Sequence, residues 1–592
     1  MCGIAGYIGK KEGLPIVFGN LKKLEYRGYD SAGVAYFDFS GDLHLQRAVG
    51  KLENLGKLVA EQKSLPLTAA IGHTRWATHG VPSEANAHPH FDCQKEIFLV
   101  HNGIIENYQD LKEELIKKGH RFRSETDTET AAHLIEEYGW ERALKKIVGA
   151  YALAVIFQKE PQKLYIARLG SPLVVGVGKD GYYVASDPTA LAGLVKKVVY
   201  LKDGQRGVLS LEGMAIGPAR PKIEPLTINP EQARKGHFPH FMLKEIFEGP
   251  EVVRSALRGR LMIKKNSVKL GGLEAVAGKF RKIRKLDILA CGTSYYSGLI
   301  GELLFEELSG IHAETALASE YRYRKMPPSK GSALFISQSG ETADTLAALR
   351  KANGNNLLTL GIVNAVGSSI ARETVAGVYN HAGPEIGVAS TKAFLSQLAV
   401  LILMSLYANP AKKHREIIKE LAAIPGKMES TLKQSARLKT LAKKYQKYGN
   451  FLYLGRGYNY PTALEGALKL KEISYVHAEG YAGGEMKHGP IALIDKNFPT
   501  VALVNKNHLY EKMISNLEEI KARGGPIIAI ATEGDKMVGK VADDVIYVPA
   551  TAEQLEPMLN VVPLQLFAYY FSVLRGNDVD KPRNLAKSVT VE

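Results

Sequence analysis

The residue whose position predicts chemistry most directly is Cys2, which follows the initiator methionine. Removal of that methionine would give Cys2 a free α-amine, whose ordinary pKa of about 7.7–8.0 leaves a usable fraction neutral at pH 7. The amine could take the proton of its own thiol and make it a nucleophile. From position alone, a plain small residue at the start of a chain is the better interpretation, so the neighbouring motifs decide.

Four polar motifs contain groups that an amide-cleaving thiol needs, namely HTRWATHG (73–80), NAHPH (86–90), HNGIIEN (101–107) and SETDTE (124–129). Asn102 and Gly103 could form an oxyanion hole from a side-chain amide and a backbone N–H. Arg75 and Asp127 carry the charges that bind the α-carboxylate and α-amine of a free amino acid. Each is also an ordinary residue type, and Asp127 could simply cap the helix that follows.

Two Ser/Thr-rich segments, CGTS (291–294) and SQSGETADT (337–345), each follow a strand-like run and open a helix. Helix N-terminal N–H groups, with the hydroxyls of Ser337, Ser339 and Thr342, suit a phosphate. The alternative is that these serines are N-caps. Two such loops at neighbouring strand ends favour a ligand, because open α/β sheets bind ligands at that edge. The chain has no G-K-[ST], which disfavours a nucleotide P-loop.

A charged stripe lies on one face of a predicted helix, because Glu465, Lys469 and Glu472 stand at i, i+4 and i+7. Spacing alone favours a solvated, salt-bridged face, and the functional interpretation is a base beside a cation in a pocket. His488 titrates near neutrality. Lys587 lies in a strand-like apolar tail and is either part of a frayed terminus or a Schiff-base former.

Potential metal ligands form a loose group in the N-terminal region, His79, His88, His90 and Cys93. Their spacing matches no regular zinc pattern, and His88-Pro-His90 places two of them on a loop. With three cysteines and no C-x-x-C, a disulfide framework is also disfavoured. We therefore expect no metal site.

With MCGIAGYIG (1–9) and LEYRGYDSAG (24–33), the N-terminal motifs resemble the glutaminase domain of class II, N-terminal-nucleophile amidotransferases. The resemblance implies a four-layer αββα fold. It implies Cys2 as nucleophile and self-base, with Asn102 and Gly103 as the oxyanion hole. It also implies that glutamine is held by Arg75, Trp76, Thr78 and Asp127, and that Trp76 gates the passage of ammonia.

The second half resembles the isomerase half of the glutamine–fructose-6-phosphate aminotransferase family, which is built from two sugar isomerase (SIS) modules. The resemblance is carried by CGTSYYSG (291–298), the SQSGETADT loop, EIGVASTKAF (385–394), LEGALKLKEISY (464–475), GEMKHGP (484–490) and DKPRNLAKSVTVE (580–592). It implies an aminotransferase that makes glucosamine 6-phosphate and glutamate from fructose 6-phosphate and glutamine. This is the first step of hexosamine (UDP-N-acetylglucosamine) biosynthesis.

The same resemblance implies roles for individual residues of the sugar site. Lys587 would form an imine at C2, so no pyridoxal or redox cofactor is needed. Glu472, assisted by Lys469, would move a proton between C1 and C2. His488 would open the ring and come from the second subunit of a homodimer. The sugar phosphate would be held by Ser294, Ser337, Gln338, Ser339, Thr342, Val388 and Ser390.

The elements that must position these residues predict a multidomain α/β protein. Four strand-like runs after residue 285 recur at a near-constant offset, which indicates two tandem α/β subdomains with parallel sheets. Only the first keeps the SQSGETADT loop, so we expect one complete site per pair. The predicted divisions are a glutaminase domain at 2–218, a linker at 219–243, SIS subdomains at 277–416 and 442–582, and a tail at 583–592 that contributes to the sugar site.

Smaller elements are predicted from local patterns. Helices are expected from 107 to 118 and from the end of DTET to about 138. GVGKDG (176–181) matches a dinucleotide loop by letter, but a strand-like run follows it, which indicates a hairpin turn. The apolar stretch 398–408 is too short to span a bilayer and is expected to be a buried helix.

Composition limits the function classes. The 592 residues include 77 Lys and Arg against 61 Asp and Glu, a net charge of +16. These basic residues are dispersed, and the densest runs, such as KFRKIRK (279–285), have no interleaved aromatic platform or groove-reading motif, so we expect no nucleic acid partner. The N-terminus has no apolar signal region, so we expect no membrane partner and a cytoplasmic location.

Two other functions fit parts of the pattern. A class II amidotransferase with a phosphoribosyl acceptor would need a diphosphate-binding motif, which we do not find. A protein that senses sugar phosphates without turnover would not need to retain the potential catalytic residues Cys2, Glu472, His488 and Lys587 together.

Overall fold

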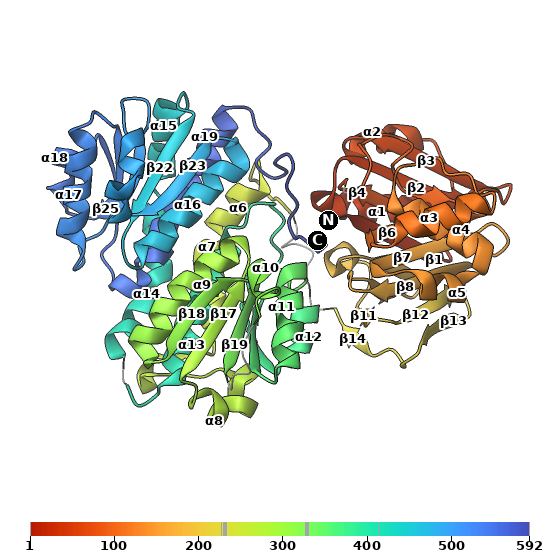
Figure 1. Cartoon of the computed structure of the whole chain (residues 1–592), viewed down its shortest axis with the longest axis horizontal. Coiled ribbons are helices and arrows are strands. Elements are labelled where there is room, and N and C mark those ends of the chain that lie inside the picture. The colour runs from red at the N-terminus through yellow and green to blue at the C-terminus, as the bar shows by residue number, and fades with distance from the viewer. Residues whose placement is uncertain are drawn as a thin grey trace. The chain divides into compact units, whose positions relative to one another are not determined.

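The computed structural model describes residues 2–77, 79–226, 228, 234–325, 331–412 and 414–590. The chain folds into two compact units, one of Met1–Arg234 with Ala586–Glu592 and one of Lys235–Leu585. The boundary at Arg234 falls inside the predicted linker. We describe each unit by itself (Figure 1).

The first unit contains two antiparallel sheets. The eight-stranded sheet has the order β14 (Ile223–Pro225), β11 (Lys197–Tyr200), β9 (Val174–Val177), β10 (Gly181–Ala185), β1 (Gly3–Gly9), β4 (Ala69–Arg75), β2 (Ser31–Phe37) and β3 (Leu43–Val49). The six-stranded sheet has the order β13 (Gly213–Gly217), β12 (Arg206–Ser210), β8 (Lys163–Leu169), β7 (Gly149–Phe157), β6 (Ile97–Ile105) and β5 (His90–Phe91).

Helices cover the outer face of each sheet and complete four layers. Helices α1 (Gly13–Leu24) and α2 (Leu52–Val59) share a core with the eight-stranded sheet. The six-stranded sheet packs on α3 (Tyr108–Lys117), α4 (Asp127–Tyr138) and α5 (Trp140–Lys146). A third core lies between the sheets, because strands buried on both sides, such as β1 and β7, turn apolar side chains to each face. This confirms the predicted αββα fold.

The second unit contains two parallel five-stranded sheets with the same strand order. One is β18 (His312–Leu317), β17 (Lys285–Ala290), β19 (Ser332–Ser337), β20 (Leu358–Val363) and β21 (Ala376–Tyr379). The other is β23 (His477–Ala482), β22 (Asn450–Gly455), β24 (Thr500–Val504), β25 (Ile527–Thr532) and β26 (Asp544–Val548). The four predicted strand pairs match β17/β22, β19/β24, β20/β25 and β21/β26, which confirms the duplication.

Each parallel sheet is sandwiched by helices, as parallel sheets require. The first is flanked by α9 (Gly292–Leu304), α10 (Ala318–Tyr321), α11 (Ala343–Gly354), α12 (Ser369–Glu373) and α13 (Lys392–Ala408) (Figure 1). The second is flanked by α14 (Arg415–Leu432), α15 (Ser435–Tyr445), α16 (Asn459–Ser474), α17 (Tyr510–Lys521), α18 (Val538–Val541) and α19 (Glu556–Leu574). Two more helices, α6 (Phe241–Phe247) and α7 (Gly249–Leu257), join the larger core of this unit.

Two helices of this unit have no solvent-facing stripe. Every residue of α13 is buried, which confirms the buried helix predicted around 398–408. Within the described residues, the segment 553–574 that contains α19 is long and apolar enough to cross a membrane. However, 83% of its most apolar window is buried inside the unit, as in the core helix of a large domain.

Local predictions agree closely with the structure. Helix α3 lies within the predicted range 107–118, and α4 begins at Asp127, inside the DTET motif. The GVGKDG segment joins antiparallel β9 and β10, so it is a hairpin turn. The prediction that the C-terminal tail around Lys587 is strand-like is wrong, because no described residue after β26 is in a strand.

Candidate functional site

Cys2 directly precedes β1 and lies beside the end of β4. The two strands pair antiparallel with Gly3 opposite Thr74, so Cys2 comes alongside Arg75 and Trp76. The Trp76 backbone N–H donates to the Cys2 Sγ at 3.3 Å. Burial raises the pKa of the Cys2 thiol, while the Trp76 amide and the Arg75 charge act in the opposite direction. The half-buried sulfur thus has a fixed donor and a nearby cation.

The Asn102 side chain is held with its amide nitrogen toward Cys2. Asn102 Nδ2 donates to the Cys2 carbonyl oxygen at 2.9 Å. His73 Nε2 lies 3.0 Å from both the Asn102 Oδ1 and the His101 carbonyl oxygen. Burial lowers the pKa of His73 to about 3, so the ring is neutral, and facing two acceptors its Nε2 must carry the proton. His73, which sequence reasoning missed, therefore orients Asn102.

Gly103 has a backbone conformation that favours glycine. Its φ is +142°, and a Cβ atom there would lie 1.9 Å from the Ala150 carbonyl oxygen. Gly103 and Asn102 are consecutive on β6, so their donors stand next to each other near the start of β1, as an oxyanion hole requires.

Asp127 and Arg75 are both buried in the same unit. Asp127 Oδ2 accepts from the Ile105 N–H at 2.8 Å, and Oδ1 lies 3.9 Å from His79 Nδ1. Thr126, not Asp127, is the N-cap of α4, so the capping alternative for Asp127 is wrong. The Arg75 guanidinium donates to the carbonyl oxygens of His79 and Gly80. Thr78 lies outside the described residues.

A second missed residue fixes the loop after β4. The Asp30 carboxylate accepts from the Ala77 N–H at 2.8 Å, and the Asp30 N–H donates to the Arg75 carbonyl oxygen at 2.9 Å. Gly28 must be glycine, because a Cβ atom there would lie 2.6 Å from the Arg75 backbone. His73 lies in the HTRWATHG motif, and Gly28 and Asp30 lie in the LEYRGYDSAG motif. Their place in these two motifs is the signal by which the sequence could have revealed them.

In the second unit, two predicted phosphate loops lie at the same sheet edge, because β17 and β19 are adjacent parallel strands. Ser337 Oγ accepts from the Gly340 N–H at 3.0 Å and pairs with Thr342 Oγ1 at 3.0 Å. Ser339 Oγ accepts from the Glu341 N–H at 3.1 Å. These contacts shape the loop that opens α11, and Gln338 lies half-buried within it.

The remaining sugar-site candidates stand at helix starts. Ser294, in the first turn of α9, accepts from Gln397 Nε2 at 2.9 Å. Ser390 donates to Glu385 Oε2 at 3.0 Å, and Glu385 Oε1 accepts backbone N–H groups at the start of α13. Val388 is buried, and its N–H donates to the Asp580 carbonyl oxygen at 3.0 Å.

The charged stripe on α16 is buried rather than solvated. Lys469 Nζ lies 2.7 Å from Glu472 Oε2, 3.4 Å from Glu465 Oε1 and 3.0 Å from Thr293 Oγ1. Lys469 and Glu465 are fully buried, and Glu472 is 21% exposed. Burial raises the pKa of Glu465 to about 7, although Lys469 opposes this. Burial alone would lower the pKa of Lys469, but the two carboxylates raise it, so it stays a cation.

Two predicted catalytic residues, His488 and Lys587, belong to segments other than the loops and helices described so far. His488 is exposed at the end of the short 3-10 helix η7 (Glu485–His488). Lys587 is half-buried in the segment that begins at Ala586, which groups with the first unit. Their roles at the sugar site stay predictions.

The loose group of potential metal ligands, from which we expected no metal site, is spread over several places. His88 stacks on His73 at 4.0 Å between ring centroids, and His90 lies edge-on to His88 at 4.7 Å. Burial lowers the pKa of His88 and His90, so this stack is neutral. Cys93 instead lies beside His120 and His133.

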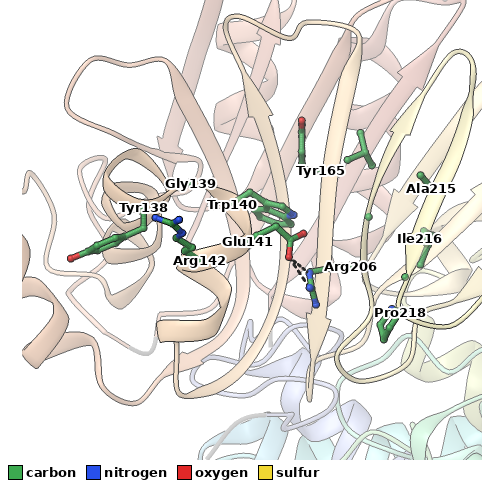
Figure 2. A pocket seen from close by; sticks show the side chains of 13 residues that line it. Tyr138, Gly139, Trp140, Glu141, Arg142, Tyr165, Arg206, Ala215, Ile216 and Pro218 are labelled. Atoms are coloured by element: carbon green, nitrogen blue, oxygen red, sulfur yellow. Dashed lines mark hydrogen bonds and ion pairs between the residues drawn. The ribbon is translucent and has the colours of Figure 1, made fainter.

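Two cavities are formed by described residues other than the predicted site residues. One, of about 830 Å³, lies where α5 faces β12 and β13, and Arg206 and Glu141 pair across it at 2.7 Å (Figure 2). The other, of about 440 Å³, is lined by Leu299, Arg456 and Tyr460 among others.

Comparisons with known proteins agree with the division of the chain into two units. The glutamine amidotransferase domain family matches residues 35–206, and the SIS domain family matches 279–406 and 444–575. A glutamine–fructose-6-phosphate aminotransferase [isomerizing] from Chlorobaculum tepidum is 47% identical over 616 residues, and one from Bacteroides thetaiotaomicron is 48% identical over 615, each covering 100% of both chains. The solved C-terminal domain of glucosamine-fructose-6-phosphate aminotransferase from Francisella tularensis covers 59% of this chain and 100% of its own, with 38% identity and a TM-score of 0.56.

Proposed function

The chain belongs to the glutamine–fructose-6-phosphate aminotransferase family, and we propose on this basis that it makes glucosamine 6-phosphate and glutamate from fructose 6-phosphate and glutamine. The observation that carries the proposal is the contact of Lys469 with Thr293 at 3.0 Å. It joins the buried acid–base array of α16 to the phosphate loop of α9, so a sugar phosphate bound there would meet groups that can move protons.

The glutaminase half uses Cys2. Its thiolate attacks the glutamine amide carbon, and the developing oxyanion accepts hydrogen bonds from Asn102 Nδ2 and the Gly103 N–H. Ammonia leaves, and water hydrolyses the thioester to glutamate and regenerates the thiol. Arg75 and Asp127 hold the α-carboxylate and the α-amine, and Thr78 completes this set. The hydrogen bond from neutral His73 supports the scheme, because it fixes the Asn102 amide in the donating orientation.

The sugar half proceeds through an imine. His488 of a second copy opens the ring, and the Lys587 amine condenses with the C2 carbonyl and releases water. Ammonia displaces the lysine from C2 and leaves a sugar imine. Glu472 then moves a proton from C1 to C2, which gives the 2-amino aldose. The Lys469 ammonium lies 2.7 Å from Glu472 Oε2 and holds this carboxyl group in place.

Phosphate recognition falls to the hydroxyls and amides of two loops, Ser294 with Ser337, Gln338, Ser339 and Thr342, while Val388 and Ser390 line the sugar. Trp76 gates ammonia, which must pass from one active site to the other without meeting water, where it would be protonated and lost. The proposal includes a homodimer, because His488 is exposed at its own surface, and a cytoplasmic location.

The test is a product assay on the purified chain with its initiator methionine confirmed removed. Glutamate and glucosamine 6-phosphate should form in a 1:1 ratio with little free ammonia. A Cys2→Ala variant should lose both products, whereas His312→Gln, which changes an exposed histidine of the other unit, should not. Glutamate and ammonia without amino sugar would exclude this acceptor, and no turnover of either substrate would favour a sugar-phosphate sensor.

A further inference from the structure

Four side chains that the proposed reaction does not use converge in the first unit. Cys93, His120, His133 and Glu136 bring one ligand atom each to within 4.8 Å of one another. They come from three segments, since Cys93 follows β5, His120 follows α3, and His133 and Glu136 stand one turn apart on α4. Separations of 13 to 27 residues between successive segments hide this group in the sequence.

Four of the six distances between the ligand atoms are close to the edges of a metal tetrahedron. Cys93 Sγ lies 3.6 Å from His120 Nδ1 and 3.5 Å from His133 Nδ1. Glu136 Oε2 lies 3.0 Å and 3.2 Å from the same two nitrogens. With metal–sulfur bonds of about 2.3 Å and metal–nitrogen or metal–oxygen bonds of about 2.0 Å, tetrahedral edges are about 3.5 Å and about 3.3 Å.

The far side of each imidazole carries the partner that metal-bound histidines have. His133 Nε2 faces Glu129 Oε1 at 3.6 Å, and His120 Nε2 faces Glu137 Oε2 at 3.3 Å. Carboxylates in this position fix the tautomer that leaves Nδ1 unprotonated for a metal.

Hydrogen bonding alone explains this arrangement poorly. Each ring has a carboxylate oxygen near both nitrogens, whereas one neutral imidazole can donate from only one of them. The His133 side chain is fully buried and the His120 side chain is 8% exposed, so the second nitrogen of each ring has no water to turn to. A metal at the Nδ1 atoms gives that nitrogen a partner, and Nε2 then donates to the carboxylate behind it.

We propose that Cys93, His120, His133 and Glu136 bind one structural zinc ion. On binding, the thiol releases its proton to solvent, and zinc with one thiolate, one carboxylate and two neutral imidazoles has no net charge. Four protein ligands close the coordination sphere, which is typical of structural sites. The ion would tie the segment after β5 and the loop before α4 to the helix that begins with Asp127, a proposed glutamine ligand. This site was not expected from sequence.

Metal analysis on the untagged full-length chain, purified without chelator, tests the proposal. We expect about one zinc per chain by mass spectrometry, and near none in Cys93→Ser and in His133→Gln. The matched control is His312→Gln, an exposed histidine in the other unit that also pairs with a glutamate, and it should keep its zinc.

Cobalt provides a readout that does not depend on the metal history of the preparation. After zinc removal, one equivalent of Co²⁺ should give a thiolate charge-transfer band and tetrahedral visible bands that are absent in Cys93→Ser. Zinc should also raise the melting temperature of the metal-free wild-type protein, by about 5 °C or more, and leave that of Cys93→Ser unchanged. Wild-type protein that holds no zinc and gives no cobalt bands would overturn the proposal, whether or not the variants fold.

Discussion

At the scale of single residues, the centre of the second unit is defined by an imbalance of buried charge. Lys469 is enclosed by Glu465 and Glu472, so one cation faces two carboxyl groups. Glu465 is the fully buried member, and its pKa of about 7 makes it the proton reservoir of the array. Glu472 is the member nearer to solvent, with 21% of its side chain exposed.

This imbalance predicts a pH dependence of stability. The folded Glu465 holds its proton to about pH 7, whereas in the unfolded chain it ionises near its ordinary 4.5, so wild-type stability falls as pH rises between these values. Glu465→Gln cannot ionise, so we expect its stability relative to wild type to rise across this window, by on the order of 3 kcal/mol. Urea unfolding of both proteins at pH 5 and pH 7.5 measures this, and a difference that does not change with pH would contradict it.

At the scale of elements, close approach of helices is set by glycine. Gly466 lies on α16 where it meets α19, and an added Cβ atom would lie 2.7 Å from Leu564 and 3.0 Å from the Tyr453 ring. Gly426, on α14, has nothing within 4 Å of the same added atom. Replacement of glycine by alanine should therefore have opposite effects on stability at these two positions.

We expect Gly466→Ala to lower stability by about 1–3 kcal/mol through overpacking. Gly426→Ala should raise it by up to about 1 kcal/mol, because alanine is the better helix former. Thermal unfolding of both variants measures the shifts. Equal shifts of the melting temperature with the same sign in both variants would show that α16 and α19 can move apart without loss of stability.

The elements that sequence predicted best are those with an unbroken pattern. The repeated strands β17 and β22 are buried apolar runs, and the β9–β10 turn is marked by glycines. The edge strands β18 and β23 were missed, because His312–Leu317 and His477–Ala482 alternate exposed polar residues and contain no apolar run. Tertiary pairing with β17 and β22 makes them strands, and a single sequence does not display pairing.

The candidate site was predictable where its residues lie in one motif and not where they meet across the fold. Asn102 and Gly103 are consecutive, and Lys469 and Glu472 share one turn. Cys93, by contrast, was grouped with His88 and His90 because they are near in sequence, although its neighbours in space are 27 and 40 residues away.

At the scale of the whole molecule, the two halves of the second unit have become different. The strand registers, together with the face that each strand turns to the shared core, place Ser294 opposite Asn459 and Gln338 opposite Asn505 when the two sheets are compared. In the second sheet this edge is filled, because Asn459 donates to Glu556 Oε2 at 2.7 Å and to Asn505. The Glu556 carboxyl group therefore occupies the sheet edge of the second half, whereas the same edge of the first half presents serine and threonine hydroxyl groups.

We therefore expect one fructose 6-phosphate to bind per chain, with an n-value near one by titration calorimetry. Thr342→Val in the first half should weaken binding by about tenfold or more, because it removes a hydrogen bond to a charged group. Lys506→Ala changes an exposed cation at the position equivalent to Ser339 and should leave the affinity unchanged. Two bound sugars, or weaker binding in Lys506→Ala, would show that the second edge is also occupied.

The buried helices α13 and α19 also bear on how the chain is made. The core of the second unit extends from Met242 to Val579, and α19 is its last helix. At roughly 5–20 residues per second on the ribosome, this unit must wait tens of seconds before its final helix emerges. During that time α13, apolar on every side, has no complete core to enter. The nascent chain should therefore be a strong client for chaperones that bind exposed apolar helices.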